Sequence, residues 1–364
     1  MIGIIGEYNP FHNGHLYHIK KVKEMFPNDI ICLVLVGNFL NRGDVSVIEK
    51  YDKTLLALEY GVDLVVELPT TFAIQSADIY AYGAITILNH LKCNYLVFGS
   101  ESNNLEVLNK IADFQINNNI DISEYVKKGY NYPTSLSLAI QKKLNIKIDS
   151  PNDLLGISYI KAIKKLNSQI KPITIKRTNH YHDLETSGKI SSATSIRNLI
   201  NNNENIEKYV PPKTLKYIKN INLNDFYQII KYKIMTDDLT KYQDIDSNLS
   251  NSLKKHIAKA NNIEELINLI KCKNYTYNKI KRCLVHILCC LYKNNYKIEY
   301  IRILGFNQKG KSYLNKIKKE VTLPLITNYN KLLNYQLLTD KIYALVSNDI
   351  KITKPIYKNT TTNM

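Results

Sequence analysis

The stretch MIGIIGEYNPFHNGHL, residues 1–16, runs from an apolar segment directly into a His-x-Gly-His motif. Residues 1–5 are apolar or glycine, which predicts a short buried strand. From residue 16 to residue 26, apolar side chains recur at helical spacing, so a helix is expected directly after the motif. A loop at a helix N-terminus presents backbone N–H groups and the positive end of the helix dipole, an arrangement that suits an anion.

The motif itself, His12-Asn13-Gly14-His15, carries groups that bind phosphate. The two imidazoles can donate hydrogen bonds to phosphate oxygens, and Gly14 allows the backbone to approach a ligand closely. An isolated tetrapeptide of this kind is more often a pair of ordinary surface histidines. Its position between the first expected strand and the first expected helix favours the phosphate site.

The first half of the chain alternates short apolar runs with amphipathic segments. This pattern predicts an α/β fold, in which a parallel sheet is flanked by helices and ligands bind at the carboxyl ends of the strands. The expected strands are Met1 to Ile5, Ile30 to Val36, Leu64 to Glu67, Tyr95 to Phe98 and Pro172 to Arg177. The expected helices include Tyr51 to Tyr60, Ala77 to Asn89 and Leu154 to Leu166.

The pattern changes after the polar run of residues 201–205 and the Pro211-Pro212 pair. Long segments rich in Leu, Ile, Lys and Tyr follow with helical periodicity, which indicates a boundary. We therefore expect an α/β domain over residues 1–205 and an α-helical domain over residues 206–364. Within the second domain, residues 307–311 predict a turn that opens another helix, and residues 358–364 a frayed tail.

Charge is distributed unevenly between these two parts. The net charge is +17 overall; residues 1–205 hold 21 Lys and Arg against 20 Asp and Glu, whereas residues 206–364 hold 28 against 12. A general bias towards lysine would act on both parts alike. The excess of +16 in the second part therefore favours contact with a polyanion, and the tyrosines interleaved there can stack on bases.

Targeting segments and metal-binding patterns are not indicated. No apolar run reaches the length of a membrane span, and an N-terminal strand leaves no room for a leader, so a cytoplasmic protein without a membrane partner is expected. The six cysteines show no CxxC pair and are interpreted as buried thiols. A zinc site at His286, Cys289 and Cys290 is the less favoured alternative, and no metal site is inferred.

A second motif, SSATSIR, occupies residues 191–197. Its hydroxyl groups precede an expected helix, and helix N-capping alone would explain them. Arg197, in the first turns of that helix, has the charge needed to neutralise a leaving pyrophosphate, with Thr194 beside it.

Together the two motifs resemble the nucleotidyltransferase superfamily, whose members are Rossmann-like α/β proteins with an HxGH loop and a later ISSTxIR-like stretch. Further stretches are similar to one family within it, the bacterial tRNA(Met) cytidine acetate ligases. These stretches are VGNFLNRG at 36–43, GVDLVVELP at 61–69, QSA at 75–77, FGSE at 98–101, YTY at 275–277 and YIRILGFNQKG at 300–310.

The resemblance implies a specific reaction. The enzyme would activate acetate with ATP to acetyl-adenylate, and would then transfer the acetyl group to N4 of the wobble cytidine of elongator tRNA(Met), giving N4-acetylcytidine. His12 and His15 would be the catalytic histidines, and Mg²⁺ is expected to enter with ATP. The implied ATP-binding residues are Glu7, Tyr8, Asn9, Pro10, Phe11, His12, Asn13, Gly14, His15, Leu16, Lys20, Gly99, Asn152, Arg177, Thr194 and Arg197.

The basic helical domain would hold the anticodon stem of the tRNA. The expected tRNA contacts are Lys279, Lys281, Arg282, Arg302, Lys309 and Lys311. Two alternatives remain open from the sequence: a small-molecule adenylyltransferase acting on a cofactor precursor, which would have no use for a separate basic domain, and a non-catalytic RNA-binding protein, which would not need both histidines and Arg197.

Overall fold

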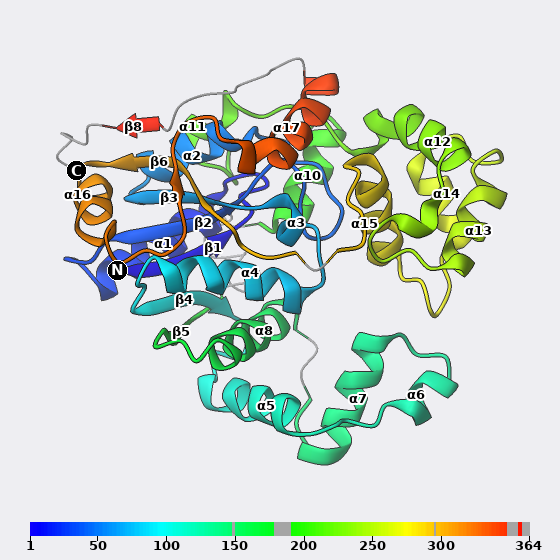
Figure 1. Ribbon diagram of the computed structural model, residues 1–364, viewed down its shortest axis with the longest axis horizontal. Coiled ribbons are helices and arrows are strands. Elements are labelled where there is room, and N and C mark those ends of the chain that lie inside the picture. The colour runs from blue at the N-terminus through cyan, green and yellow to red at the C-terminus, as the bar shows by residue number, and fades with distance from the viewer. Residues whose placement is uncertain (148–149, 178–190, 295, 348–355, 359–364) are drawn as a thin grey trace.

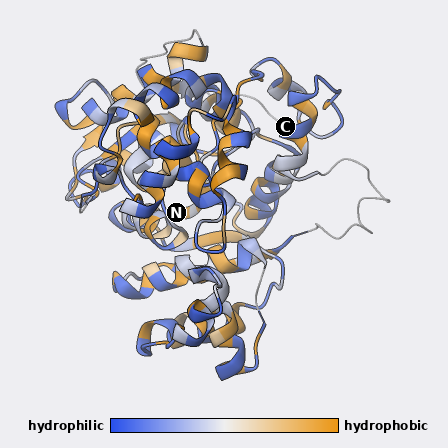
Figure 2. Cartoon of the chain, turned by 90° about the vertical axis from the view of Figure 1, so that its right-hand side faces the viewer, coloured by the Kyte–Doolittle hydropathy of each residue, from blue (hydrophilic) through white to orange (hydrophobic). Residues whose placement is uncertain are grey.

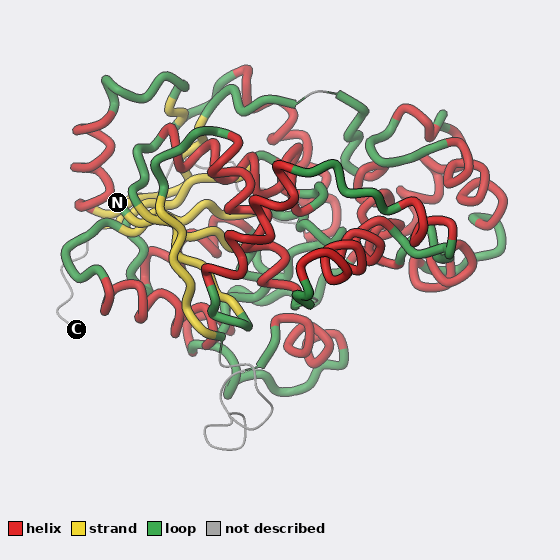
Figure 3. Tube along the Cα trace, turned by 90° about the horizontal axis from the view of Figure 1, so that it is seen from below, coloured by secondary structure: helices red, strands yellow, loops and turns green. Residues whose placement is uncertain are grey.

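The computed structural model describes residues 1–147, 150–177, 191–294, 296–347 and 356–358. The structure has a single mostly parallel sheet with helices on both faces, and a helical lobe lies beyond the ends of the strands (Figures 1 and 3). The expected α/β architecture is confirmed, and of the tail expected to fray, only Lys358 lies within the described residues.

The strands follow the order β5-β4-β1-β2-β3-β6-β7, and β8 pairs with β6. All pairings among β1 to β5 are parallel. Each of the five strands expected from the sequence is present within about two residues of its expected bounds. The strands are β1 (Ile2–Gly6), β2 (Ile31–Val36), β3 (Leu64–Leu68), β4 (Tyr95–Ser100), β5 (Lys171–Lys176), β6 (Ile301–Asn307), β7 (Leu325–Ile326) and β8 (Ile356–Lys358).

The order of the strands defines where a ligand can bind. The chain leaves β1 for β2 and β3 on one side, then crosses to the other side for β4 and β5. This reversal places a topological switch point between β1 and β4, where the two outgoing loops diverge and leave a crevice at the carboxyl ends of the strands. The His-x-Gly-His motif follows β1, at this point of the sheet.

Amphipathic helices cover both faces of the sheet, and most carry hydrophobic and hydrophilic residues side by side (Figure 2). The α-helices of the first part are α1 (Asn13–Met25), α2 (Lys50–Glu59), α3 (Thr70–Ala73), α4 (Ala77–His90), α5 (Leu105–Asn117), α6 (Ser123–Lys127), α7 (Tyr132–Leu144), α8 (Pro151–Lys165) and α10 (Ala193–Asn201). Those that follow are α11 (Pro212–Leu215), α12 (Tyr227–Thr236), α13 (Ser247–His256), α14 (Ile263–Ile270), α15 (Tyr277–Leu288), α16 (Gln308–Ile317) and α17 (Asn334–Ser347). Short 3-10 turns cover Leu223–Phe226, Leu239–Lys241 and Lys331–Leu333.

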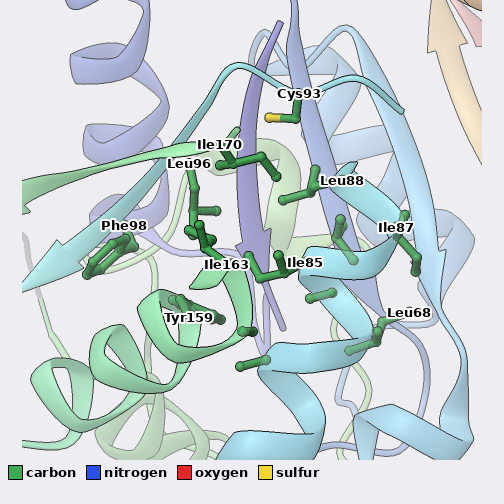
Figure 4. Packing of buried hydrophobic residues seen from close by; sticks show 14 of the residues in the cluster. Leu68, Ile85, Ile87, Leu88, Cys93, Leu96, Phe98, Tyr159, Ile163 and Ile170 are labelled. Atoms are coloured by element: carbon green, nitrogen blue, oxygen red, sulfur yellow. The ribbon is translucent and has the colours of Figure 1, made fainter. Parts of the chain in front are cut away.

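The two faces of the sheet have separate cores. On one face, α8 packs against β4 and α4 packs against β2 and β3, with Leu88, Leu96 and Ile163 among the buried side chains (Figure 4). On the other face, Ile19 and Val22 of α1 pack beneath β1 and β2. Side chains of β1 alternate between the two faces, as the pleat of a strand requires.

The expectation that residues 206–364 are entirely helical is wrong for the last part of the chain. Helices α12 to α15 do form a helical lobe, and its hydrophobic core also includes Phe39, Val45 and Ile74 of the first part of the chain. The chain then returns to the sheet, where β6 pairs antiparallel with β3 and carries β7 and β8. Gly310 at the start of α16 lies so close to β3 that an added Cβ would be 2.2 Å from the main-chain oxygen of Asp63.

A buried ion cluster joins this returning segment to the first half of the chain. Lys50 of α2 donates to Glu67 of β3 at 2.8 Å and to Asp340 of α17 at 2.5 Å. Arg302 of β6 donates to Glu67 at 2.9 Å and to the hydroxyl of Tyr51 at 2.7 Å. Two cations and two carboxylates thus balance one another in the interior. The Lys50–Asp340 and Arg302–Glu67 contacts each link residues more than 200 positions apart in the sequence.

The cysteines are free thiols. Cys32, Cys93, Cys283 and Cys289 are buried, as expected, but Cys272 is exposed and Cys290 is half-buried, so the interpretation as buried thiols is wrong for Cys272. His286, considered above with Cys289 and Cys290 for a zinc site, points both ring nitrogens at backbone oxygens, those of Gln243 and Ile74. Its ring therefore links α15 to the segment after α3.

Candidate active site

Helix α1 begins in a capping arrangement formed by the two motif histidines. The backbone N–H of Gly14 donates to Nδ1 of His12 at 3.0 Å, and the backbone N–H of His12 donates to Nδ1 of His15 at 3.3 Å. Because each Nδ1 accepts a hydrogen bond, the proton of each neutral ring must reside on Nε2. The two rings, whose centroids are 3.8 Å apart, therefore offer a pair of N–H donors at the positive end of a helix.

Burial keeps both histidines uncharged. It lowers the pKa of His12 to about 3, with the charges of Arg177 and Arg197 acting in the same direction. Burial also lowers the pKa of His15 well below its ordinary value, with His12, Arg177 and His18 contributing. Neutral rings with fixed Nε2–H donors stabilise phosphate oxygens through hydrogen bonds and do not act as bases at neutral pH.

A third histidine, absent from the motif, lies on the same side of α1. His18 follows His15 by nearly one helical turn, and its Nε2 is a buried atom with no hydrogen-bond partner among the described residues. Burial lowers the pKa of His18 to about 4, with Arg177 contributing. The spacing of three residues on an expected helix was the sequence signal that could have identified it.

Residues from β4, α8 and β5 form the opposite side of the site. Asn152 donates to Oε1 of Glu101 at 2.5 Å and accepts from the guanidinium of Arg177 at 3.3 Å. Gly99 lies beside Arg177, since an added Cβ there would be 3.1 Å from the Arg177 Cγ. Among the described residues, Arg177 Nε has no hydrogen-bond partner, and it lies 4.0 Å from Glu101, so part of this guanidinium is available to a ligand.

Arg177 connects these two sides. After burial, its positive charge is a further cause of the lowered pKa of His12, His15 and His18. The structure thus brings together the β1–α1 loop and the ends of β4 and β5, across the switch point of the sheet. Gly99, Asn152 and Arg177, which are more than 80 positions from the histidines in sequence, belong to the same site.

Arg197 approaches the β1–α1 loop from α10. Its guanidinium donates to the main-chain oxygen of Asn9 at 2.9 Å and to the hydroxyl of Thr194 at 3.2 Å. The side chain of Ser192 caps α10 by accepting from Ser195 N, as expected for the hydroxyls of this motif. The SSATSIR stretch and the His-x-Gly-His loop, 180 residues apart, are therefore in contact.

Asp44 is a site residue that the sequence did not reveal. Its carboxylate pairs with Arg197 at 3.4 Å and also with Lys281 of α15. Gly43 before it has a φ of 78° and lies against the backbone of Lys281, where an added Cβ would be 2.5 Å from the carbonyl carbon. The loop after β2 thus connects the arginine of the site with the helical lobe.

Several residues of the expected ATP loop hold the loop in place. Asn9 accepts from the N–H of Val47 at 2.8 Å, Asn13 is bonded to the backbone of residues 208–209, and Phe11 is fully buried against Tyr60. Tyr8 and Pro10 are buried, Tyr8 against the His15 ring, and Leu16 packs on the α1 face of the core. Their roles are structural unless a ligand contacts their backbone.

Lys20 is not brought to the other site residues. It is exposed, and five residues after His15 it projects about 140° away around α1 at 100° per residue. The expectation that Lys20 contacts ATP has no support in the described geometry, because His18 and not Lys20 lies on the face of the helix that carries His15.

The residues expected to contact tRNA do not form one surface. Lys279, Lys281 and Arg282 lie on α15, where Lys279 covers the Tyr275 ring at 4.9 Å and Arg282 pairs with Asp244 at 3.0 Å. Lys309 and Lys311 are exposed on α16, which begins at the amino end of β3, about 16 Å along the sheet from its carboxyl edge. Arg302 is only 5% exposed and serves the buried ion cluster, so the expectation that it contacts tRNA is wrong.

Comparison with known proteins shows the family of this chain. The family model for HIGH Nucleotidyl Transferase matches residues 1–357. A tRNA(Met) cytidine acetate ligase of Caldicellulosiruptor saccharolyticus is 39% identical, over 94% of this chain and 93% of the relative. The chain belongs to the tRNA(Met) cytidine acetate ligases, within the HIGH nucleotidyltransferases.

Other tRNA(Met) cytidine acetate ligases match over nearly the full length. The Fusobacterium nucleatum ligase is 37% identical over 98% of both chains. The crystal structure of Thermotoga maritima TmcAL bound with alpha-thio ATP matches with a TM-score of 0.90 and 27% identity, over 99% of each chain. Among the residues that the structure describes, no helix combines the length and apolar character needed to span a bilayer.

Proposed function

We propose that this protein is an ATP-dependent tRNA(Met) cytidine acetate ligase, which acts in the cytoplasm on acetate, MgATP and elongator tRNA(Met). The observation that carries the proposal is the joined site at the switch point, where His12, His15, Arg177 and Arg197 converge from three separate parts of the chain. The match to ligases of this family over the helical lobe as well as the sheet favours this activity over that of a cofactor adenylyltransferase.

In the first step, a carboxylate oxygen of acetate attacks the α-phosphorus of ATP, and the bond from that phosphorus to pyrophosphate breaks. The Nε2–H groups of His12 and His15, aided by the N-terminus of α1, stabilise the charge that develops on the phosphate oxygens. Arg177 and Arg197 neutralise the phosphates from the two sides of the loop. Asn152 is positioned to bind the nucleoside end, since it lies with Gly99 and Glu101 at the end of β4.

In the second step, N4 of the wobble cytidine attacks the carbonyl carbon of acetyl-adenylate and AMP leaves. The base must leave the anticodon stack to reach the crevice, as is usual for enzymes that modify bases. The helical lobe adjoins the carboxyl edge of the sheet through the Asp44–Lys281 contact. A tRNA bound to this lobe would therefore lie next to the crevice.

Incubating the purified protein with acetate, MgATP and unmodified tRNA(Met) is expected to produce N4-acetylcytidine, detected by nucleoside mass spectrometry. Omission of acetate or ATP should abolish the product, because the acetyl donor is formed from both. If pyrophosphate is released only with a phosphorylated cofactor precursor, the protein is an adenylyltransferase of small molecules. If tRNA binds with no acetate-dependent consumption of ATP, it is an RNA-binding protein without turnover.

Exposed lysines of the helical lobe are expected to supply the salt-dependent part of tRNA binding. Lys271 and Lys273 follow α14 and are both exposed, and the side chain of Lys273 lies against Gly129 of the α6–α7 hairpin. Replacing both by alanine should weaken tRNA binding and reduce the slope of log affinity against log salt by about 2, since each phosphate contact contributes roughly 1. Filter binding across a salt series measures the slope.

The matched control removes the same charge from the other end of the sheet. Lys309 and Lys311 are equally exposed on α16, and the double alanine variant should leave the slope unchanged. If the slope of log affinity against log salt falls for the Lys309 and Lys311 variant but not for the Lys271 and Lys273 variant, the tRNA binds at the amino ends of the strands, away from the proposed site.

A further inference from the structure

Glu7, the first residue after β1, directs its carboxylate to the face of the sheet opposite α1. Alternate residues of β1 face α4: an added Cβ at Gly3 would lie 2.8 Å from Leu88, and Ile5 packs in the same core. Alternation places Glu7 on that face as well, at the carboxyl edge. The carboxylate thus lies across the end of β1 from His12 and His15, which are on the α1 side.

Polar groups from three elements surround this carboxylate. The backbone N–H of Asn41, in the loop after β2, donates to Glu7 Oε1 at 2.9 Å. Tyr80 on α4 and Tyr159 on α8 belong to the core on the same face of the sheet. Burial is the main cause of the raised pKa of both phenols, and the Glu7 charge adds to it. The charged groups nearby are Asp44, Lys53 and Arg197.

The acetyl transfer needs a proton acceptor. When N4 attacks the acetyl carbonyl carbon, the new C–N bond forms, the bond from carbon to the AMP oxygen breaks, and AMP leaves with the electron pair. The nitrogen must then lose one of its protons. A cytidine amine is a poor nucleophile, so removal of this proton in the transition state accelerates the reaction.

Four other ionisable groups near the end of β1 are already engaged. His12 and His15 accept hydrogen bonds at Nδ1 and carry their protons on Nε2. Lys53 Nζ donates to the main-chain oxygens of Glu7, Val36 and Gly37 at 2.7 to 2.9 Å. Asp44 is held between Arg197 and Lys281. The Glu7 carboxylate has a described hydrogen bond only at Oε1, so Oε2 is the oxygen open to a proton.

We propose that Glu7 is the general base that accepts the N4 proton during acetyl transfer. This role rests on the proposed function and differs from the ATP contact that the family resemblance implies. Burial raises the pKa of the Glu7 carboxyl, and Asp44 acts in the same direction, whereas the Asn41 N–H, Lys53 and Arg197 oppose the shift. A carboxylate of raised pKa is a stronger base than an exposed one.

The variant Glu7→Gln separates this role from a structural one. Glutamine keeps an oxygen to accept from Asn41 N–H, but its amide cannot take a proton. We expect acetyl transfer to tRNA from preformed acetyl-adenylate, measured in a single turnover, to slow by about 10²-fold or more. Acetate-dependent exchange of pyrophosphate into ATP, which reports the first step, should fall by less than tenfold.

The pH profile gives an independent readout. Only the ionised Glu7 can accept a proton, so the wild-type transfer rate should rise with pH until it passes the raised pKa of this carboxyl, and then level off. The Glu7→Gln variant should lack this rise. If Glu7 only anchored Asn41, the pH profile would be the same in the wild type and in Glu7→Gln, because glutamine can still accept from the Asn41 N–H.

The outcomes are distinct. If Glu7→Gln slows pyrophosphate exchange and acetyl transfer equally, or leaves the transfer rate unchanged, Glu7 is not the general base. The proposed ligase function of the protein would still stand. Absence of N4-acetylcytidine with the wild-type protein would instead overturn the proposed function, and the role of Glu7 with it. Glu7→Ala, which also removes the acceptor for Asn41, should impair both steps and so shows what a structural loss looks like.

Discussion

Replacing His12 by asparagine is expected to slow acetyl-adenylate formation by about 10²- to 10³-fold while leaving the stability of the fold near that of the wild type. His12 serves two purposes that this substitution separates. Its Nδ1 caps helix α1 by accepting from Gly14 N, and its Nε2–H is the donor offered to phosphate. Asparagine is among the best N-capping residues, but its short side chain has no counterpart of Nε2.

The size of the expected loss follows from the role of one preorganised donor. Removing a single hydrogen-bond donor from a site that stabilises developing charge typically costs about 10² to 10³ in rate. Acetate-dependent exchange of labelled pyrophosphate into ATP measures this step. Thermal unfolding of the same preparation checks that the cap is retained.

Two comparisons make the result interpretable. His12→Ala should lose the same activity and, in addition, about 1 kcal/mol of stability, because the cap is removed. His15→Ala is expected to abolish adenylation, since it removes the second donor and the acceptor that orients the His12 backbone. Wild-type exchange rates in His12→Asn would mean that the histidine only caps the helix and that phosphate is held elsewhere.

The fold of the first half follows closely from sequence periodicity. Apolar runs such as residues 31–36 are buried on both sides, and the structure places them in the parallel sheet as expected. The His-x-Gly-His and SSATSIR stretches also meet as expected, because both precede helices whose N-termini face one edge of the sheet. Local sequence patterns were sufficient to predict these two motifs, because each lies at a strand end or a helix N-cap and contains residue types that bind phosphate or cap helices.

The parts that sequence could not predict depend on long-range pairing. Residues 300–307 fall within the part of the chain expected to be an α-helical domain, yet β6 pairs with β3 in the sheet. Asp44 has no local signature, and its importance comes from Arg197 and Lys281, which lie 153 and 237 positions away. Arg302 was expected at a nucleic-acid surface because of its charge, and only burial beside Glu67 reveals its role.

Arg302→Ala is expected to destabilise the protein by about 3–5 kcal/mol, the usual cost of removing one partner from a buried ion pair. In the native cluster, Lys50 and Arg302 balance Glu67 and Asp340, and all four side chains are at least 90% buried. Without Arg302, one negative charge is left uncompensated in the interior, and the hydroxyl of Tyr51 loses its donor. Urea unfolding monitored by circular dichroism measures the loss.

The loss of stability in Arg302→Ala is expected to depend on pH. Burial alone would raise the pKa of Glu67, but Lys50 and Arg302 outweigh it and hold this pKa below the ordinary value. A carboxyl with a lowered native pKa stabilises the fold fully above its unfolded pKa, and this contribution is lost as the pH falls through the native pKa. The stability difference between wild type and Arg302→Ala should therefore be largest at neutral pH and should narrow in acid.

Lys309→Ala, on the exposed surface of the helix that follows β6, is the control and should unfold at the wild-type urea concentration. Arg302→Lys keeps the charge but cannot bond Glu67 and Tyr51 at the same time, as the guanidinium does. Its stability should therefore fall between that of Arg302→Ala and that of the Lys309→Ala control. Because Arg302→Lys remains folded, it also tests the surface role directly: a tRNA contact would appear as a change in salt-dependent affinity. Wild-type stability in Arg302→Ala, accompanied by weaker tRNA binding, would show that this arginine faces the nucleic acid and that the helical lobe and the end of β6 form one binding surface.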